Sequence, residues 1–147
     1  MRMREVQVTF DCVDPGAQAG FWCEVLGYRA QGPPLGFDSW DEALDAWKVP
    51  PEERTSRAAA LPPEGESGPR LFFQCVPEGK SAKNRLHLDV SAAPGREGEE
   101  RMRTLTAEAT RLLGLGATCV RRVEPDGVME TGFIVMQDPE GNEFCLD

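Results

Sequence analysis

The sequence predicts an α+β fold in which two βαβββ modules form curved mixed sheets around a cleft. The same order of elements, strand–helix–strand–strand–strand, occurs twice along the chain. In both halves the predicted helix ends in a Leu-Gly pair that leads into a strand, at Leu26-Gly27 and at Leu115-Gly116. The length of 147 residues is normal for one domain. We therefore expect a single domain over residues 1–147, with a first module over about residues 1–80 and a second over about 81–147.

The first half opens with an alternating, β-rich stretch at residues 6–13, which predicts a strand. Asp14 is a good N-cap and Pro15 is favoured at the first helical position, so a helix is expected up to Gly27. A short inserted helix is expected at about residues 38–48, with Ser39 as its cap and Pro50-Pro51 as its end. The remaining strands of this half are expected at residues 28–30, 57–61 and 70–76.

The second half is expected to begin with a strand over residues 84–91. In it Leu86, Leu88 and Val90 share one face, and His87 and Asp89 share the other. A helix is expected over residues 95–113, with an apolar stripe made of Met102, Leu105, Ala109, Leu112 and Leu113. Strands are expected from residue 115 to 120, 131 to 137 and 143 to 146, the last two joined by a turn at residues 138–142.

Composition and charge exclude several classes of protein. The net charge of −9 argues against a nucleic-acid partner, because phosphate contacts need a basic face. No apolar run approaches the ~20 residues of a membrane span, and no apolar segment follows the basic residues at the N-terminus. The five cysteines contain no CxxC pair, so we expect reduced, buried thiols and a cytoplasmic protein.

Three groups of residues, taken in order, carry a family resemblance. The first is Asp14-Pro15 followed by Phe21-Trp22 and Leu26-Gly27-Tyr28, the second is Lys83 to Asp89, and the third is Asp138 to Cys145. With these the chain resembles the vicinal oxygen chelate superfamily of glyoxalase, bleomycin-resistance and dioxygenase proteins, and within it the bacterial glyoxalase-like domain group. The resemblance covers nearly the whole chain and also implies a homodimer.

The resemblance implies where a metal would bind. Metal-dependent members of the superfamily hold a divalent ion with residues from the first and last strands of each module. Carried over to this chain, those positions fall on Gln7, His87 and Cys145, and on either Phe72 or Gln74, with the register of the last left open. The set contains one histidine and no carboxylate. The candidate metal ligands are therefore His87 and the side-chain amide of Gln7.

The single histidine limits the chemistry. His87 alone cannot supply a site of three histidines, nor the two histidines of a non-haem iron triad. An extradiol dioxygenase is thereby excluded, and a glyoxalase I-like site, which wants two glutamates, is disfavoured. We expect no cofactor, and a divalent metal remains the alternative.

Three candidate residues have both a functional and a structural interpretation. His87 is either a ligand-contacting residue or general base, or a hydrogen-bonded histidine within a sheet. Cys145 is either a catalytic thiolate that needs a neighbour to lower its pKa, or a buried inert thiol. Trp40 either stacks on a flat ligand from the inserted segment or merely anchors that segment.

The leading hypothesis is a small-molecule-binding protein without a classical metal site. The residues expected to line its cleft are Gln7, Thr9, Trp40, Phe72, Gln74, His87 and Cys145. One alternative is a metal-dependent lyase or isomerase that adds a carboxylate such as Glu130 or Glu143 to Gln7 and His87. Another is a non-catalytic interaction subunit whose cleft is filled by Trp40. The sequence leaves open whether the protein is an enzyme, and which ligand it binds.

Overall fold

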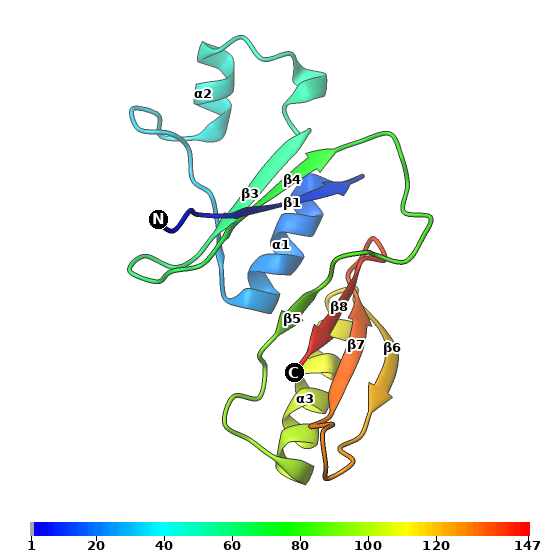
Figure 1. Cartoon of the computed structure of the whole chain (residues 1–147). Coiled ribbons are helices and arrows are strands. Elements are labelled where there is room, and N and C mark those ends of the chain that lie inside the picture. The colour runs from blue at the N-terminus through cyan, green and yellow to red at the C-terminus, as the bar shows by residue number, and fades with distance from the viewer. Residues whose placement is uncertain (1) are drawn as a thin grey trace. The chain divides into compact units, whose positions relative to one another are not determined.

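The computed structural model describes residues 2–147, and in it the chain divides into two compact units, one ending at Gly79 and the other beginning at Lys80 (Figure 1). Each unit contains one open, four-stranded mixed sheet with a long helix against it. The predicted α+β class with two βαβββ-like modules is therefore confirmed. Among the described residues, no helix is both long and apolar enough to cross a membrane.

The first unit has the strand order β1-β4-β3-β2, with β1 parallel to β4 and the other pairs antiparallel. Helix α1 lies along one face of this sheet, and the inserted segment that carries α2 projects on the other side (Figure 1). The elements are β1 (Gln7–Cys12), α1 (Pro15–Leu26), β2 (Arg29–Ala30), α2 (Trp40–Ala46), a 3-10 turn η1 (Pro51–Glu53), β3 (Arg57–Leu61) and β4 (Arg70–Cys75).

The ends of the helices in this unit follow from local chemistry. The Asp14 side chain accepts a hydrogen bond from the Ala17 amide at 3.0 Å, and Gly27 closes α1 in the left-handed region at φ 67°. Ser39 accepts from the Glu42 amide at 3.1 Å and so caps α2 as predicted. Helix α2 ends at Ala46, before the Pro-Pro pair that was expected to end it, because Trp47 is its C-cap and Lys48 follows at φ 55°. The second proline instead begins the short turn η1.

The core of the first unit lies between the sheet and α1. Trp22 of α1 is 1% exposed, and its ring lies 5.1 Å from that of Phe10, which in turn stacks on Phe73 at 5.1 Å. Leu71 is fully buried beside them. One face of this sheet is therefore committed to packing against α1.

The second unit has the strand order β5-β8-β7-β6, again with one parallel pair, β5 and β8. The buried stripe of its helix consists of Met102, Leu105, Ala109 and Leu112, and the predicted fifth member, Leu113, is 46% exposed. This helix begins at Gly98, three residues after the predicted start. The elements are β5 (Leu88–Val90), α3 (Gly98–Leu113), β6 (Thr118–Val123), β7 (Phe133–Gln137) and β8 (Glu143–Leu146).

Strand β5 is much shorter than predicted. The Asn84 amide donates to Glu143 Oε2 at 3.0 Å instead of to a strand carbonyl, and Leu86 lies outside the strand with 70% exposure. A side chain from β8 thus replaces the strand pairing that alternation predicted for residues 84–87. The expectation that Leu86 shares a face with Leu88 and Val90 is wrong.

The turn before β8 is built around a buried carboxylate. Asp138 is 2% exposed, and its Oδ1 accepts from the amides of Glu140 and Asn142, each at 3.0 Å. The Asn142 side chain donates to the same carboxylate. This is the structural turn that the sequence predicts between the last two strands.

The expectation of buried thiols holds for only one cysteine. Cys12 is buried and Cys23 and Cys145 are half-buried, whereas Cys75 and Cys119 are exposed. All five are free thiols. Apolar neighbours in sequence do not bury a residue at the end of a strand or on its solvent side.

Candidate functional site

The first candidate surface is the face of the β1-β4-β3-β2 sheet opposite α1, which we call the open face of the first unit. The register pairs Gln7 with Arg70, Thr9 with Phe72 and Asp11 with Gln74, and paired residues point to the same side. Since Phe10 and Phe73 face α1, the alternating partners face away from it. Phe72 and Gln74, between which the sequence left the register open, both lie on this open face.

Arg70 is the centre of the polar contacts on this face. Its Nε and Nη2 both donate to Gln31 Oε1, at 2.9 and 2.7 Å, and its Nη1 donates to Gln7 Oε1 at 2.6 Å. The guanidinium carbon lies 5.1 Å from the centre of the Phe72 ring, a cation–π distance. Gln7 also donates to the Thr9 hydroxyl at 3.3 Å.

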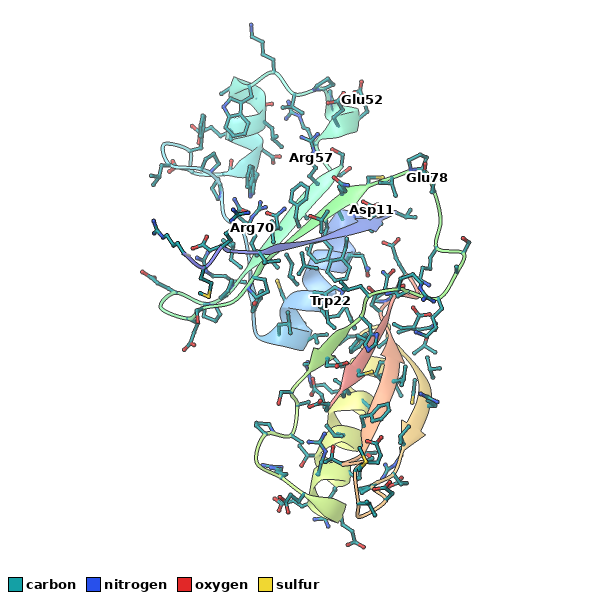
Figure 2. The ribbon with its side chains drawn as sticks, viewed as in Figure 1. Asp11, Trp22, Glu52, Arg57, Arg70 and Glu78 are labelled. Atoms are coloured by element: carbon teal, nitrogen blue, oxygen red, sulfur yellow. The ribbon has the colours of Figure 1, made fainter. Side chains whose placement is uncertain are left out.

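Arg70 was missed by the sequence analysis, although a signal was present. It stands two residues before Phe72 in one strand, so strand alternation places both on one face. Figure 2 shows Arg70, Arg57 and Asp11 on the side of the sheet away from Trp22 of α1. The contacts of Arg70 also bear on a predicted metal ligand, because the amide oxygen of Gln7 is occupied by a cationic side chain.

The inserted segment reaches the same surface through Trp40. The indole Nε1 of Trp40 donates to the Gln31 carbonyl oxygen at 2.9 Å, and the side chain stays 40% exposed. Trp47 instead meets Phe37 edge-on at 5.7 Å within the insertion itself. Of the two tryptophans, Trp40 is therefore the one connected to the residues around Arg70.

Gln74 is held at the other end of this face. Its Nε2 donates to Asp11 Oδ1 at 2.7 Å, which fixes the amide across the β1–β4 pair. Four of the predicted ligand residues, Gln7, Thr9, Phe72 and Gln74, thus share one sheet face, with Trp40 connected to it through Gln31.

The second candidate surface is the face of the β5-β8-β7-β6 sheet opposite α3. Cys145 pairs with Asp89 across β5 and β8, while the neighbouring Phe144 and Leu146 are fully buried on the helix side. His87 Nε2 lies 3.4 Å from Asp89 Oδ1, and ligand atoms of His87, Asp89 and Cys145 all lie within 4.8 Å of one another. Two predicted residues therefore meet here with a third, Asp89, which was expected on the same strand face as His87 but not among the site residues.

The surroundings of the Cys145 thiol raise its pKa and so lower its reactivity. Burial, together with the negative charge of Asp89 and a hydrogen bond to it, raises the pKa of Cys145 to about 11. At neutral pH the thiol is therefore protonated, and a catalytic thiolate is disfavoured. Of the neighbouring charges, that of Arg121 lowers the pKa of Cys145, but burial and Asp89 outweigh it.

Glu130 and Glu143, the carboxylates expected in a metal-dependent lyase or isomerase, form contacts away from His87. Glu143 accepts from the Asn84 amide and lies 3.4 Å from Lys80 Nζ, and the amide hydrogen bond holds the pKa of Glu143 below its usual value. Glu130 accepts from the Gly132 amide at 3.2 Å in the loop before β7. Asp89 is the carboxylate that stands beside His87.

These three side chains fit a zinc ion better than a hard cation. Imidazole, carboxylate and thiolate are all zinc ligands, and three protein ligands leave a fourth position free for water or substrate. Manganese and magnesium favour oxygen donors, so the thiol of Cys145 suits them poorly. A zinc ion would also have to displace the Cys145 proton, because only the thiolate is a ligand.

Two open mixed sheets, each with one helix behind it and a polar face in front, define a glyoxalase-like fold. The family model described as Glyoxalase-like domain matches residues 7–146, and the chain belongs to this family. No curated protein matches the chain by sequence.

Solved structures support the same fold at low sequence identity. A hypothetical protein of S. aureus is 10% identical with a TM-score of 0.60, covering 99% of this chain and 94% of its own. A glyoxalase/bleomycin resistance protein/dioxygenase family enzyme from Burkholderia phytofirmans is 15% identical with a TM-score of 0.58, covering 95% and 94%. The fosfomycin resistance protein FosX of Listeria monocytogenes, as a variant with Mn(II) and 1S,2S-dihydroxypropylphosphonic acid, is 10% identical with a TM-score of 0.59, covering 99% and 90%.

Proposed function

We propose that this protein binds a small organic molecule on the open face of its first unit, without a classical metal site. The observation that carries the proposal is the register that brings Gln7, Thr9, Phe72 and Gln74 onto one helix-free face. Small-molecule sites combine aromatic surface with a few placed polar groups, and this face offers the Phe72 ring beside fixed polar side chains. The FosX structure, which holds a small phosphonic acid, is support by fold alone.

The absence of a classical metal site is supported by two of the superfamily's ligand positions. Gln7 gives its amide oxygen to the Arg70 guanidinium, and a metal ion there would lie next to a positive charge. Cys145 stands where a glutamate would be expected from the resemblance, and its thiol keeps its proton at neutral pH. Enclosure of the ligand by the sheet of the second unit, and pairing of two chains in a homodimer, remain predictions.

A screen of diverse small molecules against metal-stripped protein tests this proposal. Binding is followed by thermal shift and then by titration calorimetry on the wild type and on Phe72→Ala. Because Phe72 supplies the aromatic surface, its truncation should weaken a hit by about tenfold. The matched control is Val128→Ala, which trims a residue that is 87% exposed in a loop of the other unit and should leave affinity unchanged. The proposal is refuted if no molecule binds, or if every hit binds Phe72→Ala as tightly as it binds the wild type.

A second candidate function is favoured by the convergence of His87, Asp89 and Cys145. In this alternative the three residues hold a zinc ion, and the protein is a lyase or isomerase acting beside a carbonyl group. Bound zinc would supply Lewis acidity toward a substrate oxygen. Asp89, as one of the three ligands, would also offset the charge of the ion.

A further inference from the structure

Within residues 2–147, the cationic centre of the open face contacts only neutral hydrogen-bond acceptors. Arg70 is half-buried, and its three hydrogen bonds go to the neutral amides of Gln7 and Gln31. Among the described residues, none of the carboxylates forms an ion pair with it. The protein orients this charge but leaves it uncompensated.

The guanidinium also retains free hydrogen-bonding capacity. An arginine offers five N–H donors in a rigid fork. Three of them are used by the two glutamines, which leaves one on Nη1 and one on Nη2 without an acceptor among residues 2–147. Two such donors on neighbouring nitrogens are the number that a carboxylate or a phosphoryl group needs for bidentate recognition.

The surroundings hold the guanidinium in one orientation. Phe72 lies beneath it at 5.1 Å, and Gln31 receives two of its N–H groups at once. The main chain of Gln31 is held in turn, because its backbone carbonyl oxygen accepts from the Trp40 indole at 2.9 Å. A guanidinium that is held in one orientation before binding loses little conformational entropy when it binds an anion.

The strand residues of the open face differ in charge from the protein as a whole. The chain carries a net charge of −9. By strand register, however, the open face of the first unit presents Arg29, Arg57 and Arg70 against a single acidic residue, Asp11. Asp11 is in turn occupied by Gln74. The strands of this face therefore carry a net positive charge, which favours an anionic ligand over a cationic one.

We propose that Arg70 is the recognition centre for the anionic head group of a small organic ligand, a carboxylate or a phosphoryl group. This inference rests on the proposed function, because it assigns a chemical class to the molecule bound on the open face. Gln7 and Gln31 are positioning residues that aim the guanidinium. Phe72 and the exposed part of Trp40 offer apolar surface for the rest of the ligand.

The test compares two probes that have nearly the same shape and differ in charge. Benzoate and benzamide are titrated separately into the protein, and binding is read from the NMR signals of the Arg70 Nε–H and the Trp40 indole N–H. We expect benzoate to bind about tenfold or more tightly than benzamide, because charge-assisted bidentate hydrogen bonds are lost with the neutral probe. Phenylphosphonate, titrated in the same way, distinguishes a phosphoryl from a carboxylate preference.

Three variants assign the effect to Arg70. With the Trp40 indole signal as readout, Arg70→Gln should weaken benzoate about tenfold or more and benzamide much less. Arg70→Lys should recover only part of the loss because it lacks the fork. Arg57→Gln removes the same charge from the same face and should change affinity less than about twofold, because long-range attraction is screened by salt. Should Arg70→Gln fail to fold, Gln31→Met still tests the idea, since it frees the guanidinium and should weaken benzoate severalfold.

Equal binding of benzoate and benzamide on this face would refute anion recognition by Arg70. It would leave the proposed function intact, because a small-molecule site would still exist there. The inference would also be overturned if Arg70→Gln and Arg57→Gln weakened benzoate equally, or if neither anionic probe bound. The proposed function fails separately, when no molecule of any charge in the screen depends on Phe72.

Discussion

Asp89 and Cys145 lie directly opposite each other in the parallel pairing of β5 with β8, on the side of the sheet away from α3. The carboxylate accepts a hydrogen bond from the thiol and adds a negative charge beside it. This pair, with His87 next to Asp89, decides whether the second unit carries a reactive thiol, a zinc site or neither.

The first prediction concerns the acidity of Cys145 in metal-free protein. Asp89→Asn should lower the pKa of Cys145 from about 11, because the variant removes the negative charge next to the thiol. The pKa should stay above the ordinary 9.0, because burial is the largest cause of the shift. Thiolate absorbance against pH in a protein that keeps only Cys145 measures this directly. An unchanged pKa would show that Asp89 does not act on the thiol.

The second prediction separates the zinc alternative from the metal-free proposal. If zinc binds, its affinity should rise with pH, because each zinc ion must displace the Cys145 proton. Titration calorimetry with zinc should then show losses of about tenfold or more in His87→Ala, Asp89→Asn and Cys145→Ser. Cys119→Ser, at an exposed cysteine in β6, is the control. Weak zinc binding that is insensitive to all three variants would eliminate the metal-dependent lyase or isomerase that uses them.

The third prediction compares two aspartates whose side chains accept hydrogen bonds from backbone amides a few residues later in the chain. The buried Asp138 carboxylate satisfies two backbone amides, so Asp138→Ala should lower the free energy of unfolding by about 2–3 kcal/mol. Asp126 accepts from three backbone amides in an exposed loop, where water replaces it, and Asp126→Ala should cost much less. Urea unfolding of both variants measures the difference. Equal losses would mean that burial of Asp138 does not matter.

The fourth prediction is a pH dependence of stability through Glu143. The hydrogen bond from the Asn84 amide, helped by Lys80, lowers the pKa of Glu143 below its ordinary value of 4.5. A lowered pKa stabilises the fold above pH 4.5, and this contribution is lost as the pH falls through the folded-state value. Glu143→Gln should therefore cost about 1–2 kcal/mol at pH 7 and less at pH 3. A cost that does not change with pH would rule out a role for the charge.

The parts of the fold that local chemistry determines were predictable. Helix α1 begins and ends where Asp14 and Gly27 predict, and the last strand has its predicted bounds. Strand β5 was predicted too long, because the Glu143 side chain that captures the Asn84 amide comes from a distant part of the chain. Alternation alone contains no information about such a contact.

The candidate site was predictable in its residues but not in their partners. Alternation assigned Thr9, Phe72 and Gln74 to strands, and the register showed that they share one face. The contact between Arg70 and Gln31 joins β4 to the loop after β2, and no local pattern specifies it. Asp89 was visible on the same predicted face as His87, but its meeting with Cys145 depends on the pairing of β5 with β8.

The most direct test of the central claim is to locate a bound small molecule by the side-chain amide signals of the glutamines in a ¹H–¹⁵N NMR spectrum. Gln7, Gln31 and Gln74 belong to the open face of the first unit or to its Arg70 contacts, whereas Gln18 is fully buried in α1 on the other side of the sheet. Our account predicts that a hit from the screen shifts the first three amides and leaves Gln18 in place. Saturable binding that moves none of the three, or that moves Gln18 alone, would contradict it.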